Sequence, residues 1–145
     1  MFPIIVSAAA LTLTAPVHSA DISHGATRYR ASYETISTVH FQQVEPRFAT
    51  RSATPVCRWQ ANVGVARTVN SEGHAVSALG KAIHRFTPLS GSYAGACASA
   101  RSQIDAEMDR YARANAAEAL MVAQQDSATV SGELQALHSL SVKGG

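Results

Sequence analysis

The chain has little charge of either sign and few aromatic side chains. Of its 145 residues, 15% are charged and 6% are aromatic, and the formal net charge is only +2. Proteins that bind nucleic acid concentrate basic side chains on one surface, and those that bind single strands add aromatic rings on which the bases stack. The composition therefore argues against nucleic acid as a partner.

The chain also lacks the spaced ligands of a metal site. No histidine lies in an H-E-x-x-H or H-x-H arrangement, and none has a second histidine at helical spacing. The histidines beyond the first twenty residues are His24, His40, His74, His84 and His138. Because zinc needs several such ligands at one point, we predict isolated histidines and neither a metal nor another cofactor.

No sequence motif of a catalytic nucleophile or of a phosphate-binding loop is present. Residues 91–95 read GSYAG, so Ser92 stands one place too early for the G-x-S-x-G turn that exposes a nucleophile. A G-x-x-x-x-G-K-[ST] loop is absent as well. We therefore predict a protein that is not an enzyme. The alternative is a minor hydrolase or small-ligand binder whose site forms only in the fold, with Ser92 beside His74 or His84.

Cysteine is scarce, with one residue at position 57 and one at position 97. There is no C-x-x-C motif, so a redox function is not indicated, and two cysteines in an exported chain are expected to pair. A Cys57–Cys97 bridge would close a loop of 40 residues. Restriction of the unfolded chain would then contribute about 4 kcal/mol. We predict a disulfide with a structural role.

One long apolar run is present, and it lies at the start of the chain. No charged residue precedes Asp21, and the run from Phe2 to Ala15 ends at a proline followed by small residues. This pattern is typical of a secretory signal peptide cleaved after Ser19 or Ala20; an uncleaved anchor is the alternative. We predict a signal peptide over 1–20 and one domain over 21–145, with no membrane span after cleavage, located in the periplasm or secreted.

The clearest structural pattern is the alternation of residues 56–69. Apolar side chains occupy every second position from Cys57 to Val69, interrupted only by Arg67, and the other positions are polar or small. Neighbouring side chains of a strand point to opposite faces, so this pattern predicts a strand with one buried and one wet face. Its apolar positions are Cys57, Trp59, Ala61, Val63, Val65 and Val69.

Two further strands are predicted around this one. Residues 32–44 are rich in β-branched and aromatic side chains, and 74–87 follow a turn ending in Gly73. A bulge at Gly80 would restore the alternation of the second run, and a short helix over 76–83 is the alternative. Residues 21–31 are expected to be irregular, and 90–96 are expected to form a flexible loop.

Beyond Cys97 the pattern changes to that of a helix. Residues 98–125 contain no glycine or proline and are rich in alanine, the strongest helix former. Ala100, Ile104, Met108 and Tyr111 follow one another at helical spacing. We predict a helix over 97–125, with either a short second helix beginning at Asp126 or a kinked continuation.

These elements predict a small exported α+β domain. Three antiparallel strands, near 32–44, 56–69 and 74–87, would form a small sheet covered on one face by the helix, with the disulfide joining them. The predicted function is a non-catalytic interaction or accessory domain of the cell envelope, whose partner is another envelope protein. The partner would bind at a sheet edge, at residues 46–55 or at Tyr93, for which packing over the disulfide is the alternative.

Overall fold

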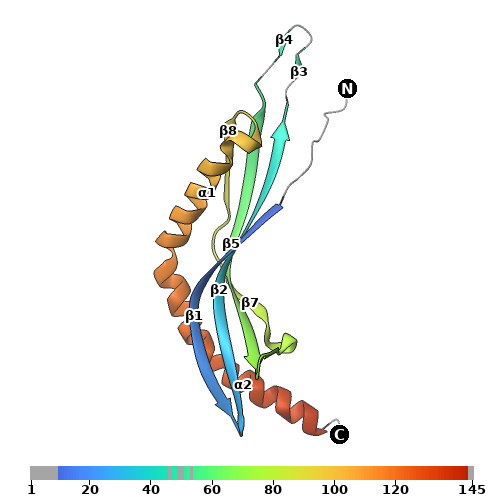
Figure 1. The fold of residues 1–145 in the computed structure, drawn as a ribbon, viewed down its shortest axis with the longest axis vertical. Helices are drawn as coiled ribbons and strands as arrows, with labels where there is room; N and C mark the ends of the chain where they lie inside the picture. Colours follow the sequence, from blue (N-terminus) through green and yellow to red (C-terminus); the bar gives the residue numbers. More distant parts are fainter. Residues whose placement is uncertain (1–9, 46, 49–50, 53, 144–145) are drawn as a thin grey trace. The chain divides into compact units, whose positions relative to one another are not determined.

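The structure is a computed structural model that describes residues 10–45, 47–48, 51–52 and 54–143. Figure 1 shows its elements. The strands are β1 (Ala10–His24), β2 (Thr27–Val44), β3 (Arg47–Phe48), β4 (Arg51–Ser52), β5 (Val56–Ser71), β6 (His74–Ala75), β7 (Lys81–Arg85) and β8 (Leu89–Ala94). The helices are the 3-10 turn η1 (Ser77–Leu79), α1 (Cys97–Ala114) and α2 (Ala116–Lys143).

The sheet is larger than the sequence patterns predict. Among the described residues, six strands form one sheet in the order β1-β2-β5-β6, with β7 and β8 also paired to β5. The predicted small three-stranded sheet is therefore wrong, although the α+β class is confirmed. Residues 21–24 and 27–31 belong to strands β1 and β2, so the predicted irregular segment over 21–31 is wrong, and 90–94 form β8 rather than a loop.

The sheet is larger than predicted mainly because three short strands pair with β5 on one side. β8 pairs with its first half, whereas β7 and β6 pair with its second half. The predicted second hairpin strand, 74–87, is divided into β6, η1 and β7. The register shifts between Val65 and Ala66 on β5, opposite β7, rather than through a bulge at Gly80. Residues 47–48 and 51–52 form a separate pair of short strands.

The helical part divides at Asn115. α1 ends at Ala114 and α2 runs from Ala116 through Asp126 and Gly132 to Lys143. The predicted boundary at Asp126 is therefore wrong. Asparagine is favoured at helix starts, and the carbonyl of Asn115 accepts a hydrogen bond from the amide of Ala119 at 2.9 Å.

The chain folds into two compact units. The first, here called the disulfide unit, comprises residues 10–13, 37–63 and 86–114. The second, here called the arginine unit, comprises residues 14–36, 64–85 and 115–143. Both β2 and β5 contribute residues to each unit, so neither unit is a continuous stretch of chain.

The core of the disulfide unit combines one face of its sheet with one face of α1. The strands bury Val39, Phe41, Cys57, Trp59, Ala61 and Val63, and the helix buries Ala100, Ile104 and Met108. These helical residues are three to four positions apart, which places them on one face. The burial of each larger apolar side chain contributes about 1.5–3 kcal/mol. The predicted alternation of the central strand and the predicted apolar face at the start of the helix are confirmed.

The arginine unit is built in a similar way. Its strands and η1 bury Ala31, Tyr33, Val65, Val69 and Leu79, and α2 buries Ala119, Ala123, Val130 and Leu134. Arg67 is buried among them, although its side chain is charged. The apolar parity of β5 therefore continues through both units, with Arg67 occupying a core position.

Candidate functional site

The open edge of the sheet in the disulfide unit is formed by β8. Antiparallel pairing joins β8 to β5 from Leu89 opposite Ala61 to Ala94 opposite Val56. Among the described residues, β8 has no strand on its other side. Ser90, Gly91 and Ser92 are exposed, and since glycine has no side chain, the exposure of Gly91 is exposure of the backbone. The edge is therefore accessible to another chain.

The position of the ladder hydrogen bonds identifies the groups that face outward. Gly95 donates its amide proton to the carbonyl of Pro55 at 2.6 Å, one step beyond the pair of Ala94 and Val56. Hydrogen-bonded and non-hydrogen-bonded pairs alternate in an antiparallel ladder. Gly91 therefore exchanges hydrogen bonds with β5, whereas Ser90 and Ser92 present their N–H and C=O groups to the open edge.

The edge strand lacks the features that usually prevent strand addition. Its sequence, LSGSYA, contains no charged residue and no proline, whereas exposed edges in natural proteins are commonly protected by lysine, proline or a bulge. Pro88 precedes the strand, and Gly95 after it adopts a φ of +116°, a conformation that glycine tolerates. These flanking residues limit the open edge to six residues.

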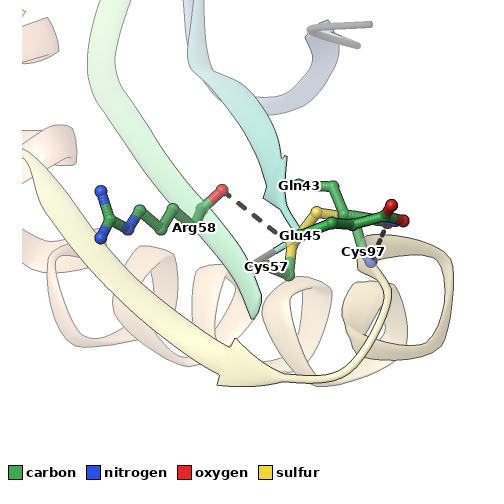
Figure 2. Close-up of a disulfide and its surroundings, with 5 residues drawn as sticks. All are labelled: Gln43, Glu45, Cys57, Arg58 and Cys97. Atoms are coloured by element: carbon green, nitrogen blue, oxygen red, sulfur yellow. Dashed lines mark hydrogen bonds between the residues drawn. A yellow bond between two sulfur atoms is a disulfide. The ribbon is translucent and has the colours of Figure 1, made fainter. Parts of the chain in front are cut away.

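The disulfide holds β5, the strand beside this edge, to the first turn of α1. The bond joins Cys57 of β5 to Cys97, with the Cα atoms 4.8 Å apart, which confirms the predicted pair (Figure 2). Gln43 of β2 accepts a hydrogen bond from the amide of Cys97 at 3.1 Å, one of the four amides at a helix start that lack a partner within the helix. The covalent bond and this cap fix the start of α1 against β2 and β5.

Two tyrosine hydrogen bonds join α1 to β8 and to the residues just before it. Tyr93 of β8 donates its hydroxyl proton to Glu107, and Tyr111 donates to the carbonyl of Thr87 at 2.7 Å. The hydrogen bond to Glu107 raises the pKa of Tyr93 above its ordinary value. The predicted partner contact at Tyr93 therefore lies in a strand, half-buried, with its hydroxyl bonded within the chain.

Trp59 packs directly against Gly91 of the edge strand. The two residues are opposite each other in the ladder, and a Cβ atom on Gly91 would lie 2.8 Å from the Nε1 atom of Trp59. The Trp59 side chain is buried, and its N–H has no hydrogen-bond partner among the described residues. Glycine at position 91 is thus required by the close approach of the indole ring.

A shallow hollow of about 530 Å³ lies across β2, β5 and β8. The alternate residues of these strands line it, and all of them carry polar side chains: His40, Gln42, Arg58, Gln60, Ser90 and Ser92. Phe41, Trp59 and Gly91 alternate with them in sequence and also line the hollow. We call this surface the polar hollow. It is the wet face that alternation on the central strand predicts.

The arginine unit contains a buried charge cluster centred on Arg67. The Arg67 side chain is fully buried and donates hydrogen bonds to Asp126 at 2.8 Å, to Glu133 at 2.5 Å and to the carbonyl of Leu79 at 2.9 Å. Tyr33 also donates to Asp126, at 2.9 Å, and Lys81 pairs with Glu133 at 2.7 Å. Each guanidinium nitrogen therefore has an acceptor, as a buried charge requires.

The protonation behaviour of this cluster follows from its contacts. Burial opposes the charge on Arg67, but the hydrogen bonds and charges of Asp126 and Glu133 raise its pKa above the ordinary value. Burial and the hydrogen bond to Asp126 raise the pKa of Tyr33. The hydrogen bond from Lys81, followed by that from Arg67, lowers the pKa of Glu133. These pKa shifts favour a charged Arg67, a charged Glu133 and a neutral Tyr33 hydroxyl at neutral pH.

Sequence reasoning did not identify the Arg67 cluster, although one signal was present. Arg67 is the single charged residue on the apolar parity of the central strand, where a charge must be paired. Its two carboxylate partners lie 59 and 66 residues further along the chain, and the sequence pattern marks Asp126 only as the start of a second helix. The sequence could indicate that Arg67 needs a partner, but not which carboxylate supplies it.

The alternative hydrolase site is not assembled within either unit. Ser92 belongs to the disulfide unit, whereas His74 and His84 belong to the arginine unit. The Nε2 atom of His84 lies 3.3 Å from Glu118, and His24 contacts His138 edge to face. In the described part of the chain, no three histidine, cysteine or acidic side chains converge as metal ligands.

No helix within the described residues is long and apolar enough to cross a membrane. No protein-family model matches the chain, and comparisons with curated proteins and with solved structures return no match.

Proposed function

We propose that this protein is an exported, non-catalytic interaction module that binds an extended segment of a partner protein along the edge of β8. The observation that carries the proposal is the outward direction of the N–H and C=O groups of Ser90 and Ser92, next to an exposed Gly91. A partner strand that pairs with this edge would satisfy these groups through main-chain hydrogen bonds, the binding mode known as β-augmentation.

The surroundings of β8 favour a preformed site. The disulfide, the Gln43 cap and the two tyrosine hydrogen bonds fix the strands and α1 before a partner arrives. A fixed edge loses little conformational freedom on binding, so more of the interaction energy appears as affinity.

The proposed location is the periplasm or the outside of the cell, and the proposed partner is another envelope protein. A disulfide persists in oxidising compartments, and the apolar run before Asp21 has the composition of a signal peptide. Of the residues before Asp21, the described part, 10–20, contributes no buried side chain to either core. Its contacts with β2 include the stacking of His18 on Tyr33 and the hydrogen bond from Arg30 to Ser19.

A second candidate function is small-ligand binding in the polar hollow. Its support is the group of polar side chains that line about 530 Å³ on one sheet face. The hollow is open and lies beside the edge strand, so we rank this function second.

The test of the proposed function uses proline on the edge. Ser92→Pro deletes an outward N–H without deleting a hydrogen bond to β5, whereas Ser92→Ala keeps the N–H and is the matched control. A photo-crosslinking amino acid at position 90, introduced in the organism that makes the protein, should capture a partner. We expect capture in the wild type and in Ser92→Ala, and its loss in Ser92→Pro.

The crosslinking control is the same photo-reactive residue at Ser102, an exposed position of α1. Capture that is equal at positions 90 and 102, or that survives Ser92→Pro in a protein with unchanged circular dichroism, would contradict binding at the edge.

A further inference from the structure

The polar hollow has the charge of a site for acidic side chains. Of the residues that line it, Arg58 is cationic and none carries a carboxylate. Among the described residues, the Arg58 guanidinium makes no hydrogen bond or ion pair, and its side chain extends away from the disulfide (Figure 2). An exposed arginine with no acidic neighbour in the hollow is a ready partner for a carboxylate brought by another chain.

The geometry of the ladder brings this charge within reach of the open edge. Arg58 is directly opposite Ser92, and Gln60 is directly opposite Ser90. Because both are non-hydrogen-bonded pairs, their side chains stand close together, with Cα atoms about 4.5 Å apart. The serine side chains are short, so they do not screen Arg58 and Gln60 from a strand on the far side of β8.

A strand added beyond β8 would lie roughly 10 Å from β5, twice the spacing of neighbouring strands. The side chains of arginine and glutamate together span this distance over Ser92. A residue of the added strand that pairs with Ser92 would direct its side chain to the same face as Ser92 and Arg58, because paired residues share a face. Its neighbours in sequence would face the opposite side.

We propose that the segment bound at β8 is acidic, with a glutamate or aspartate opposite Ser92 whose carboxylate pairs with Arg58 across the edge strand. This inference rests on the proposed function, because it assumes strand addition at β8. It adds the chemistry of the partner: an extended segment with carboxylates at alternate positions on the face of the polar hollow.

Gln60 and His40 extend the same surface. Gln60, opposite Ser90, supplies an amide N–H to a second carboxylate two residues along the added strand, since alternate residues share a face. His40 of β2 lies at the far side of the hollow, beyond β5. Arg58 and Gln60 are two residues apart on β5, so their donor groups match the spacing of alternate side chains on an added strand.

The experiment uses three labelled heptapeptides: the acidic Thr-Val-Glu-Val-Glu-Val-Thr, its counterpart with both glutamates replaced by glutamine, and its counterpart with lysine. Binding to the full chain is measured by fluorescence anisotropy at low salt. Trp59 is the single tryptophan and contacts Gly91, so its emission reports independently on events at β8.

We expect the acidic peptide to bind about fivefold tighter than the glutamine peptide, and the lysine peptide to bind more weakly than both. Arg58→Gln should remove the preference and leave both peptides bound with similar affinity. Arg101→Gln, which removes the same charge from an exposed position of α1, is the matched control and should retain the preference. The preference should also decrease as salt is added.

The outcomes separate the two proposals. If Ser92→Pro abolishes the binding of all peptides but Arg58→Gln leaves the preference unchanged, strand addition stands and the acidic-partner inference is overturned. If no peptide binds the wild type, or if binding is indifferent to Ser92→Pro, the edge site itself is contradicted. If the lysine peptide binds most tightly, the inferred sign of the partner's charge is wrong.

Discussion

Arg67 shows how one side chain can occupy a core position while remaining charged. It lies on the apolar parity of β5, yet three acceptors surround its guanidinium, and two of them are carboxylates on α2. A buried ion network of this kind favours one placement of α2 on the strands, because any other placement would leave a buried charge without its partner. We interpret it as a structural device that fixes α2 against the strands of the arginine unit.

The lowered pKa of Glu133 predicts a loss of stability in acid. A carboxyl whose folded-state pKa lies below its unfolded value of 4.5 stabilises the fold above that pH. This stabilisation disappears as the pH falls through the lower, folded-state pKa. We expect the wild type to exceed Glu133→Gln in unfolding free energy by about 1 kcal/mol at pH 6, and the difference to shrink progressively as the pH falls below 4.5. Urea unfolding at each pH measures it.

The control for this titration is Asp109→Asn, which removes an exposed pair with Arg113 on α1. An exposed helical pair contributes only about 0.3–0.5 kcal/mol, so this variant should remain near the wild type at every pH. A constant difference between wild type and Glu133→Gln from pH 6 to pH 3 would contradict an ionised Glu133 in the network.

At the scale of elements, two glycines illustrate opposite roles. Gly91 lies under Trp59 on the edge strand, where an added Cβ atom would stand 2.8 Å from the indole nitrogen. Gly132 lies within α2, where an added Cβ atom would meet no atom within 4 Å. The same substitution should therefore have opposite signs at these two positions.

We expect Gly91→Ala to lower the unfolding free energy by about 1–2 kcal/mol, because the Trp59 ring must move. Gly132→Ala should raise it by about 0.5–1 kcal/mol, because alanine is the better helix former. Urea unfolding measures both, and the emission spectrum of Trp59 should shift only in Gly91→Ala. Equal stability of the two variants would show that the indole does not need the space above Gly91.

The elements that could be predicted from sequence are those with a regular local pattern. The alternation of 56–69 correctly assigned the faces of β5, and the spacing of Ala100, Ile104 and Met108 correctly identified the buried face of α1. Residues 74–87 were predicted as one strand beside β5, but the structure divides them into β6, η1 and β7. The strand β8 could not be predicted, because it is defined by its pairing with β5 and not by its own composition. Its sequence reads as a flexible loop.

At the scale of the whole molecule, the disulfide is the strongest single constraint on the chain. It joins residues 40 positions apart, and its loop contains β5 from Cys57 onward together with β6, β7 and β8. We expect the double variant Cys57→Ala, Cys97→Ala to lose about 2–4 kcal/mol of unfolding free energy, because the unfolded chain gains freedom. Urea unfolding of the wild type with and without reductant, beside the double variant, measures this loss.

The reductant comparison is the control for cavity effects of the two substitutions. Reduced wild type and the double variant should unfold at similar urea concentrations, both below the oxidised wild type. A reduced wild type that unfolds together with the oxidised form would show that loop closure contributes little.

The sequence by itself determined the α+β class, the disulfide, the faces of the central strand and the absence of recognisable catalytic motifs, because local periodicity and residue chemistry carry these features. Only the tertiary structure decided the extent of the sheet, the carboxylates that pair with Arg67 and the open edge at Ser90 and Ser92. These three features depend on which distant segments meet, and such pairings are selected by the burial and hydrogen-bond satisfaction of the whole chain.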